Sequence, residues 1–310
     1  MKRSRSNSPR ILAMSAMAVA AGVSFCLAAP ASAAMNASDN ASNYTSSTWP
    51  NGGLPPNAGT GFGAWTLTIQ NNNSPPYAGT FFGNNASVNI SSSGAYFGMY
   101  ANGAVTTSNP AVIPSVNAAR AFENSAANGL GTLRAGQTFT AGFEIQTGNF
   151  GIGDNTGVTT GLSLDTISGA TSTPVFTLAF HQDAANSYAL VTTITDANGT
   201  TSYEAPTNAT ALTEPQIEAG INVGFALGNA GAYTLTLAPA TGNAVLTSPL
   251  TYNGNVSGAI NGVNIFDSST NANTQFNGLA ITTATPEPAS LALIGISGAV
   301  LLLARRRKTA

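Results

Sequence analysis

The stretch Thr138–Gln146, TFTAGFEIQ, alternates apolar and polar side chains along nearly its whole length. Successive side chains of a β-strand point to opposite faces, so this pattern predicts a strand with one buried side and one solvent-facing side. The buried side consists of Phe139, Ala141, Phe143 and Ile145, and the polar side of Thr138, Thr140, Glu144 and Gln146. Such alternation is typical of antiparallel sheets that cover a core on one side only.

The same alternation recurs from Gly61 onward and predicts a strand-rich domain. Five further segments carry an apolar stripe: Ala64–Gln70, Phe176–Phe180, Tyr188–Ile194, Ile221–Leu227 and Tyr233–Leu237. Six more segments are expected to form strands: Ser87–Ser91, Ala95–Ala101, Gly161–Thr166, Ala244–Thr247, Gly262–Phe266 and Phe276–Thr282. Glycine-containing turn signals at residues 197–199, 228–231 and 241–243 separate some of them.

Helical periodicity is not sustained anywhere in this region. The stretch Ser115–Asn128 contains alanines but is interrupted, and Glu214–Ala219 predicts a single helical turn. About a dozen short strands with one apolar face predict two packed sheets. No repeat of 20–50 residues recurs, which argues against a solenoid or propeller. The predicted fold class is therefore all-β, an antiparallel β-sandwich.

Four short motifs stand out among these strands: YFGMYAN at Tyr96–Asn102, ARAF at Ala119–Phe122, GQTF at Gly136–Phe139 and FNGLAIT at Phe276–Thr282. Their order resembles exported jelly-roll domains of the concanavalin A-like type, over roughly residues 61–283. The resemblance implies a jelly-roll sandwich. It implies a carbohydrate-related or structural role only by analogy, because one fold hosts many functions.

Charge is scarce and unevenly distributed. Charged residues make up 7% of the chain, against about 25% in a typical soluble domain. Between residues 35 and 285 there are two arginines, Arg120 and Arg134, eleven acids and no lysine. This acidic balance repels phosphates, so nucleic-acid binding is excluded.

The beginning of the chain predicts a secretory signal peptide. A basic stretch, MKRSRSNSPR, precedes the apolar run Ile11–Ala29. Ala31 and Ala33 fit the small-x-small cleavage pattern, so we expect cleavage after Ala33 and a mature chain that begins at Ala34. An uncleaved anchor is the alternative, because the apolar run approaches the length of a membrane span. Cys26 is the only cysteine, so the exported part has no disulfide.

The other end combines three features in a fixed order. Pro286, Glu287 and Pro288 precede the apolar stretch Ala289–Ala304. A basic cluster follows: Arg305, Arg306, Arg307 and Lys308. As a helix the apolar stretch is about 24 Å long, short of a hydrocarbon core of about 30 Å, but a bilayer can thin around it. The basic cluster is expected to stay cytoplasmic, which leaves the preceding chain on the opposite side of the membrane.

This arrangement resembles the PEP-CTERM sorting signal of Gram-negative bacteria. The resemblance covers the last 25 residues or so and implies an exosortase, a membrane protease-transpeptidase, as partner. It also implies an envelope or extracellular destination, often in bacteria that make exopolysaccharide. A plain tail anchor is the alternative. The expected organisation is a signal peptide over residues 1–33, a polar lead-in over 34–60, a β-sandwich domain over 61–284 and a sorting tail over 285–310.

Catalytic patterns are weak. A jelly-roll glycosidase needs two carboxylates about 5–10 Å apart, and the E-x-D-x-x-E strand of related glucanases is absent. Glu144 has no acidic neighbour two residues away, and Glu214 and Glu218 lie beside a proline. His181, the only histidine, shares its facing with Asp183, but no G-x-S-x-G motif marks a nucleophile. We therefore expect no enzymatic activity, with a hydrolase that uses an unrecognised carboxylate pair as the alternative.

Binding sites are also only weakly indicated. A zinc site is not expected, because the exported part has one histidine and no cysteine to serve as ligands, and no cofactor is expected. Asp154 and Asp267 open two loops with oxygen ligands for calcium, although each is better explained as a solvated turn. Four aromatic residues in polar surroundings are candidates either for stacking on sugars or for closing the ends of the sandwich: Tyr44, Trp49, Tyr77 and Tyr252.

Paired threonines suggest a third possibility. The pairs Thr66/Thr68, Thr138/Thr140 and Thr234/Thr236 lie opposite apolar stripes, where a flat array can order water as in ice-binding proteins. The alternative is that threonine serves for its β propensity. The leading expectation is a non-enzymatic cell-envelope or extracellular-matrix protein, sorted by its tail and associated with exopolysaccharide. The alternatives are a carbohydrate-active hydrolase and an ice-binding or adhesive surface protein.

Overall fold

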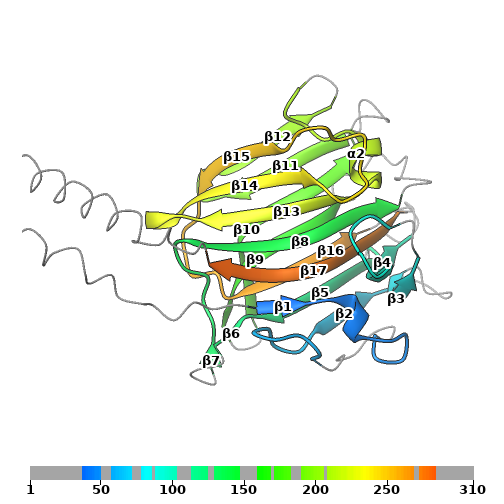
Figure 1. Cartoon of the computed structure of the whole chain (residues 1–310). Coiled ribbons are helices and arrows are strands. Elements are labelled where there is room, and N and C mark those ends of the chain that lie inside the picture. Colours follow the sequence, from blue (N-terminus) through cyan, green and yellow to red (C-terminus); the bar gives the residue numbers. More distant parts are fainter. Residues whose placement is uncertain are drawn as a thin grey trace, which may run out of the picture. The chain divides into compact units, whose positions relative to one another are not determined.

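The computed structural model describes most of the chain between residues 37 and 283. The described residues are 37–49, 57–71, 78–85, 88–102, 113–124, 129–146, 159–168, 171–182, 190–205, 208–268 and 272–283. They form two antiparallel sheets that pack as a sandwich, so the predicted all-β class is confirmed (Figure 1). The predicted signal peptide and sorting tail lie outside these residues. Among the described residues, none forms a helix with the length and apolar character needed to cross a bilayer.

One sheet has eight strands in the order β15-β14-β13-β8-β17-β4-β3, with β1 paired to β17 beside this path. Its strands are β1 (Ala37–Asp39), β3 (Ala78–Asn84), β4 (Ala95–Ala101), β8 (Gln137–Gln146), β13 (Ile221–Leu227), β14 (Ala232–Pro239), β15 (Leu250–Asn255) and β17 (Asn273–Thr283). The strand β8, which contains the alternating stretch Thr138–Gln146, lies in the middle of this sheet between β13 and β17 (Figure 1).

The other sheet has seven strands in the order β12-β11-β10-β9-β16-β5-β2. These are β2 (Thr66–Gln70), β5 (Ser115–Ala121), β9 (Thr159–Ser168), β10 (Thr171–Gln182), β11 (Leu190–Asp196), β12 (Gly199–Glu204) and β16 (Gly262–Ser268). Outside the two sheets lie the hairpin β6 (Glu123–Asn124) and β7 (Gly129–Leu130), the 3-10 turns η1 (Ala41–Asn43) and η2 (Asn229–Gly231), and the short helix α2 (Glu214–Glu218).

The strand β17 holds the eight-stranded sheet together because it is paired on both sides. β8 pairs with β17 along one edge. On the other edge, β4 pairs with Asn273–Phe276 and β1 pairs with Leu279–Ile281. At the change of partner, the strand is irregular and Gly278 adopts a positive φ of 61°. The Asn277 side chain fills this place: its Oδ1 accepts from the Ala41 amide at 2.8 Å and its Nδ2 donates to the Ala95 carbonyl at 3.1 Å.

The inward-facing side chains of the two sheets make one continuous core. Its largest side chains are aromatic and fully buried, as expected where antiparallel sheets pack face to face. Phe176 contacts Phe225 from the opposite sheet with ring centroids 4.8 Å apart, and Phe143 contacts Phe180 in the same way at 5.6 Å. The predicted stripe of β8 is buried throughout, at Phe139, Ala141, Phe143 and Ile145.

The segment expected to be a polar lead-in takes part in this core. Ala37–Asp39 forms β1, and Trp49 is 1% exposed. The Trp49 ring lies 4.4 Å from the Phe97 ring and 5.5 Å from the Trp65 ring. Apolar periodicity could not predict that this segment is part of the core. Its buried side chains are isolated from one another by polar turns, and they pack against strands that are distant in the sequence.

Most expected strands are present, with two errors. Ser87–Ser91 was expected as a strand, but Val88 and Ile90 instead pack from a turn onto the outside of the eight-stranded sheet. Ala244–Thr247 was also expected as a strand, but the Asn243 side chain accepts from the Val245 and Leu246 amides and holds a turn. The expected helical turn at Glu214–Ala219 is confirmed as α2. Ser115–Ala121, within the stretch set aside as interrupted, is strand β5.

Candidate functional site

The outward-facing side of the seven-stranded sheet carries two adjacent rows of residues without charge, most of them small. The printed strand registers join seven residues, one from each strand, into one complete row: Thr200, Thr195, Thr177, Ser163, Asn264, Ala119 and Thr66. A second complete row lies beside it: Ser202, Thr193, Ala179, Gly161, Phe266, Asn117 and Thr68. These fourteen residues are called the uncharged face below.

Hydroxyl and amide groups of the uncharged face bond to one another across the strands. The Thr195 and Thr200 hydroxyls are 3.0 Å apart, and those of Thr193 and Ser202 are 3.2 Å apart. Asn264 donates through Nδ2 to Oδ1 of Asn117 at 3.2 Å. These contacts hold donors and acceptors in a fixed arrangement. Thr66, Thr195 and Thr200 on the outer strands are exposed, whereas the middle of the face is covered, with Ser163 1% exposed and Ala179 9% exposed. The exposed hydroxyls favour contact with a polar, neutral partner over acid–base chemistry.

The outward-facing side of the eight-stranded sheet is partly covered. The segment Val88–Gly94, called the strap below, lies across it. Ile90 packs directly over Gly142, where an added Cβ would come within 2.9 Å of the Ile90 Cβ. The Asn89 side chain donates to the Ala219 carbonyl at 3.0 Å, which ties the strap to the residue that follows α2.

Glu144 lies beneath the strap and is only 7% exposed. Its Oε2 accepts from the Asn89 amide at 3.2 Å. Burial raises the pKa of the Glu144 carboxyl to about 7, and the Asn89 hydrogen bond opposes this rise. A carboxyl with such a pKa suits a general acid, but the strap separates Glu144 from solvent. Sequence alternation placed Glu144 correctly on the outer side of β8 but gave no sign of the strap.

A small cavity of about 260 Å³ lies beside the strap, lined by residues that include Asn89, Ser91, Asn222 and Thr241. It is smaller than most ligand sites, which span about 300–1,000 Å³. The other expected carboxylates, Glu214 and Glu218, lie on α2, where burial and the neighbouring Glu214 raise the pKa of Glu218.

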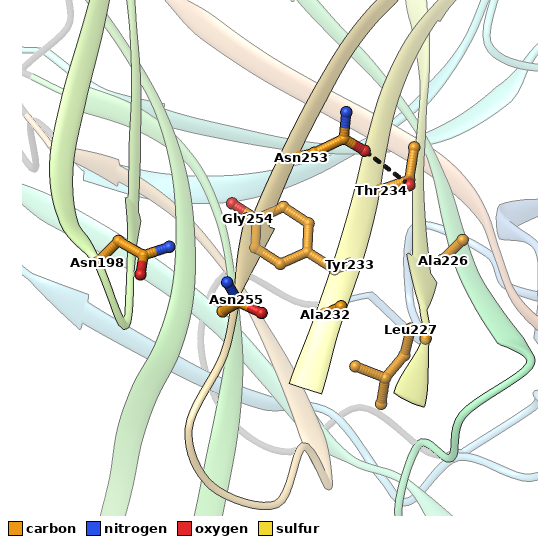
Figure 2. Close-up of a pocket in the computed structure, with 10 residues that line it drawn as sticks. Asn198, Ala226, Leu227, Ala232, Tyr233, Thr234, Asn253, Gly254 and Asn255 are labelled. Atoms are coloured by element: carbon orange, nitrogen blue, oxygen red, sulfur yellow. Dashed lines mark hydrogen bonds between the residues drawn. The ribbon is translucent and has the colours of Figure 1, made fainter. Parts of the chain in front are cut away.

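A larger cavity of about 550 Å³ opens where β13, β14 and β15 meet the hairpin between β11 and β12. Figure 2 shows the Tyr233 ring between Asn198 on the hairpin side and Leu227 on the β13 side. The Tyr233 hydroxyl donates to Asp196 at 2.7 Å, and the Thr234 hydroxyl donates to Asn253 at 2.9 Å. The lining residues carry amides and hydroxyls but no charged side chain.

A buried ion pair occupies the interior between the sheets. Arg120 of β5 contacts Asp39 of β1, and both side chains are fully buried. Arg120 also donates to the Gly63 carbonyl, and its guanidinium lies 4.6 Å from the Trp65 ring centroid and 4.7 Å from that of Phe62. Burial lowers the pKa of Arg120, and Asp39 opposes this. Every contact is internal, so the pair serves the fold.

The aromatic residues expected near polar surroundings are buried. Tyr44 and Trp49 belong to the core, and the Tyr252 hydroxyl donates to the Thr210 carbonyl. These three side chains therefore pack within the sandwich, which excludes the alternative that they stack on sugars, because their faces are covered by protein. Tyr77, the fourth candidate, lies outside the described residues.

Of the two calcium candidates, Asp154 lies outside the described residues. Asp267 is fully buried in β16 and accepts from the Thr274 hydroxyl at 3.0 Å, so the expectation of a solvated turn is wrong at this position. In the described part of the chain, no three His, Cys, Asp or Glu side chains form a group that could hold a metal ion. His181 lies on β10 opposite Val191 of β11.

The remaining predicted residues lie outside the part that the structure describes. They are the cleavage-site residues Ala31, Ala33 and Ala34, the sorting residues Pro286, Glu287 and Pro288, and the basic residues Arg305, Arg306, Arg307 and Lys308. The sequence comparison bears on the tail: residues 284–308 match the family model of the PEP-CTERM protein-sorting motif. The motif indicates export, anchoring in the membrane at the C-terminal side before processing, and recognition by an exosortase.

Fold and motif together define a class: an exported protein with an antiparallel β-sandwich and a PEP-CTERM sorting motif. No curated protein matches the sequence significantly. Among solved structures, the chain is similar to the receptor-binding domain of botulinum neurotoxin type G, with 10% identity and a TM-score of 0.33. That match covers 72% of this chain, which spans 44% of the other chain.

Two further solved structures are similar over most of their length. Alginate lyase from Pseudomonas aeruginosa shows 10% identity and a TM-score of 0.36, over 66% of this chain and 86% of the lyase. The globular domain of T. cruzi calreticulin shows 8% identity and a TM-score of 0.41, over 74% of this chain and 87% of that domain. Scores this low assign no fold family, so the concanavalin A-like jelly roll stays a prediction.

Proposed function

We propose that this chain is a non-enzymatic cell-envelope or matrix protein that binds a neutral polysaccharide through the uncharged face. The observation that carries the proposal is the pair of complete rows, in which none of the fourteen side chains is charged. Seven strands spaced about 4.8 Å apart make this face about 30 Å wide. Hydroxyls and amides at fixed positions on it match the donors and acceptors of sugar hydroxyl groups.

The negative charge of the domain favours a neutral polysaccharide over an acidic one. Eleven acids against two arginines between residues 35 and 285 repel an acidic polysaccharide, whereas a neutral polymer meets no such barrier. The PEP-CTERM motif supports the proposal because it brings the domain outside the cytoplasm, where such polymers accumulate. Burial of Glu144 beneath the strap supports a role without catalysis, because little of this carboxyl is accessible to a substrate.

The binding proposal is tested by co-sedimentation of the purified full chain with neutral and with acidic exopolysaccharide. We expect retention on the neutral polymer and about tenfold weaker binding for Thr195→Glu and Thr66→Glu, which place charge at opposite sides of one row. Thr251→Glu, on the other sheet, is the matched control and should bind as the unchanged protein does. No retention of the unchanged protein, or equal loss in the control, would contradict the proposal.

The absence of catalysis needs its own measurement. The same incubations are assayed for new reducing ends over a day. We expect none above the polymer alone. A release of reducing ends that Glu144→Gln abolishes would favour the hydrolase alternative instead.

One observation favours a second candidate function. Strand registers bring six threonines together on the outside of the eight-stranded sheet: Thr138, Thr140, Thr234, Thr236, Thr251 and Thr282. Gly224 and Ala226 of β13 separate the β8 threonines from the β14 threonines. Such an array could order water. Inhibition of ice recrystallisation by the purified chain, lost in Thr140→Lys, would favour this candidate over polysaccharide binding.

A further inference from the structure

The strand β17 connects directly to the sorting motif. It ends at Thr283, and the matched residues begin at position 284. Only Ala284 and Thr285 separate Thr283 from Pro286, and the apolar stretch begins at Ala289. Because an extended chain spans at most about 3.6 Å per residue, Thr283 lies within about 20 Å of the start of that stretch.

Hydrogen bonds identify which other parts of the sandwich share this end. Thr283 is opposite Gln137 at the start of β8, and the Gly136 amide donates to the Leu227 carbonyl at the end of β13 at 2.7 Å. Asn255, at the end of β15, is opposite Ala232 and accepts from the Ala197 amide at 3.0 Å. Three turns therefore lie at one end, called the tail end below: Arg134–Gly136, Ala197–Gly199 and Asn229–Gly231 (Figure 1).

The first strand enters at the same place. Ala37 of β1 is opposite Ile281 of β17, two residues before the strand ends. The segment that precedes β1 and the segment that follows β17 therefore both leave the sandwich at the tail end. A chain attached to a membrane through either segment presents the same end of the domain to that membrane.

Both ends of the sandwich carry acidic side chains. The three turns of the tail end carry one charged side chain, the exposed Arg134. Two acids lie near them: Asp196, whose carboxylate accepts from Tyr233 and from the Asn198 amide, and the exposed Glu123 of β6. The opposite end carries Glu214 and Glu218 on α2, one length of β13 away, or about 24 Å for its seven residues.

We propose that the tail end of the sandwich rests on the lipid headgroup surface while the protein is anchored and unprocessed, with the α2 end directed away from the membrane. The short connection prevents the domain from turning over. With the α2 end on the membrane, Thr283 would lie about 24 Å from the surface, farther than the connection of about 20 Å can reach. The uncharged face then stands beside the membrane, not against it.

The proposal is tested with single-cysteine labels on the full chain in a Cys26→Ser background. Asn229→Cys places a fluorophore at the tail end and Ala209→Cys places one near α2; both positions are exposed. The chains are reconstituted in vesicles that carry an energy acceptor on the lipid headgroups. We expect energy transfer from position 229 to be several-fold more efficient than from position 209. Equal transfer, or stronger transfer from position 209, would overturn the proposal.

A spacer variant tests the physical cause. Twenty Gly-Ser residues inserted between Thr283 and Ala284 lengthen the connection severalfold and leave the sandwich unchanged. We expect the difference between the two labels to shrink toward zero. A difference that persists unchanged would show that the short connection does not set the orientation. These measurements contain no polysaccharide, so their outcome is independent of the proposed binding function.

Discussion

The Asp39 carboxylate on β1 of the eight-stranded sheet contacts the Arg120 guanidinium on β5 of the seven-stranded sheet, with both side chains fully buried. The contact joins two residues 81 positions apart in the chain. Tyr44 and Trp65 also donate to the Asp39 carboxylate, at 3.1 and 3.2 Å. The segment that precedes the predicted domain thus supplies the counter-charge for a buried arginine.

Arg120→Ala is expected to lower the free energy of unfolding by about 3–5 kcal/mol, because it leaves the Asp39 charge buried without its partner. Urea denaturation of the purified protein measures this. The matched control is Arg134→Ala, which removes an exposed arginine and should change stability by less than about 0.5 kcal/mol. If the two residues act as a pair, combining Asp39→Ala with Arg120→Ala costs less than the sum of the single losses. Full additivity would contradict the pairing.

Trp49→Ala tests whether the expected lead-in belongs to the core. Removing a fully buried tryptophan costs about 3–5 kcal/mol, and we expect that loss in the free energy of unfolding. Val245→Ala is the comparison, since Val245 is 49% exposed and its truncation should cost less than about 0.5 kcal/mol. A Trp49 variant as stable as the unchanged protein would contradict the packing of Trp49 in the core.

The stability of the fold should depend on pH through Glu144. Its pKa is about 7 in the folded protein and about 4.5 when exposed. The protonated form therefore favours folding, and this contribution is complete below pH 4.5 and is lost as pH rises through 7. Since one pKa unit corresponds to about 1.4 kcal/mol, the loss by pH 8 amounts to about 3 kcal/mol.

Glu144→Gln should remove most of that dependence, because the amide stays neutral and can still accept from the Asn89 amide. Urea midpoints measured from pH 4.5 to 8 should fall for the unchanged protein and stay nearly level for the variant. Glu123→Gln, which alters an exposed acid, is the control and should follow the unchanged protein. Parallel curves for Glu144→Gln and the unchanged protein would refute the assignment.

The tail deletion tests sorting separately from folding. Removing Pro286–Ala310 leaves β17 complete, because that strand ends at Thr283. We expect the truncated domain to be exported, to fold and to appear in the medium instead of the membrane fraction. Mass spectrometry of the protein from envelope and medium locates it and gives both of its ends. An unchanged location would count against a sorting role for the tail.

The sequence predicted individual strands well wherever alternation was long enough to define a buried side. β8, β13 and β14 match their expected positions closely, since each carries seven or more residues with a consistent facing. It failed at Ser87–Ser91, where Val88 and Ile90 have the spacing of a strand but belong to the strap. Alternation records which side chains are buried, and it does not record whether the backbone has a neighbouring strand to pair with.

The candidate site was less accessible to sequence reasoning. The Thr-x-Thr pairs are recognisable one by one in the sequence, but nothing local indicates that Thr66 and Thr200 lie in one row. Register between strands follows from side-chain packing across the whole sheet, and a slip of one residue would turn every side chain to the other face.

By itself, the sequence determined the all-β class and the sorting motif. Each depends on residues that are neighbours in the chain: alternation within a strand, and a linear signal that a membrane protease reads. Only the tertiary structure decided that Asp39 neutralises Arg120, that the strap covers Glu144, and that fourteen uncharged residues share one face. These relationships join residues many positions apart in the chain. They depend on which strands pair and in which register, and many local sequences are compatible with each such pairing.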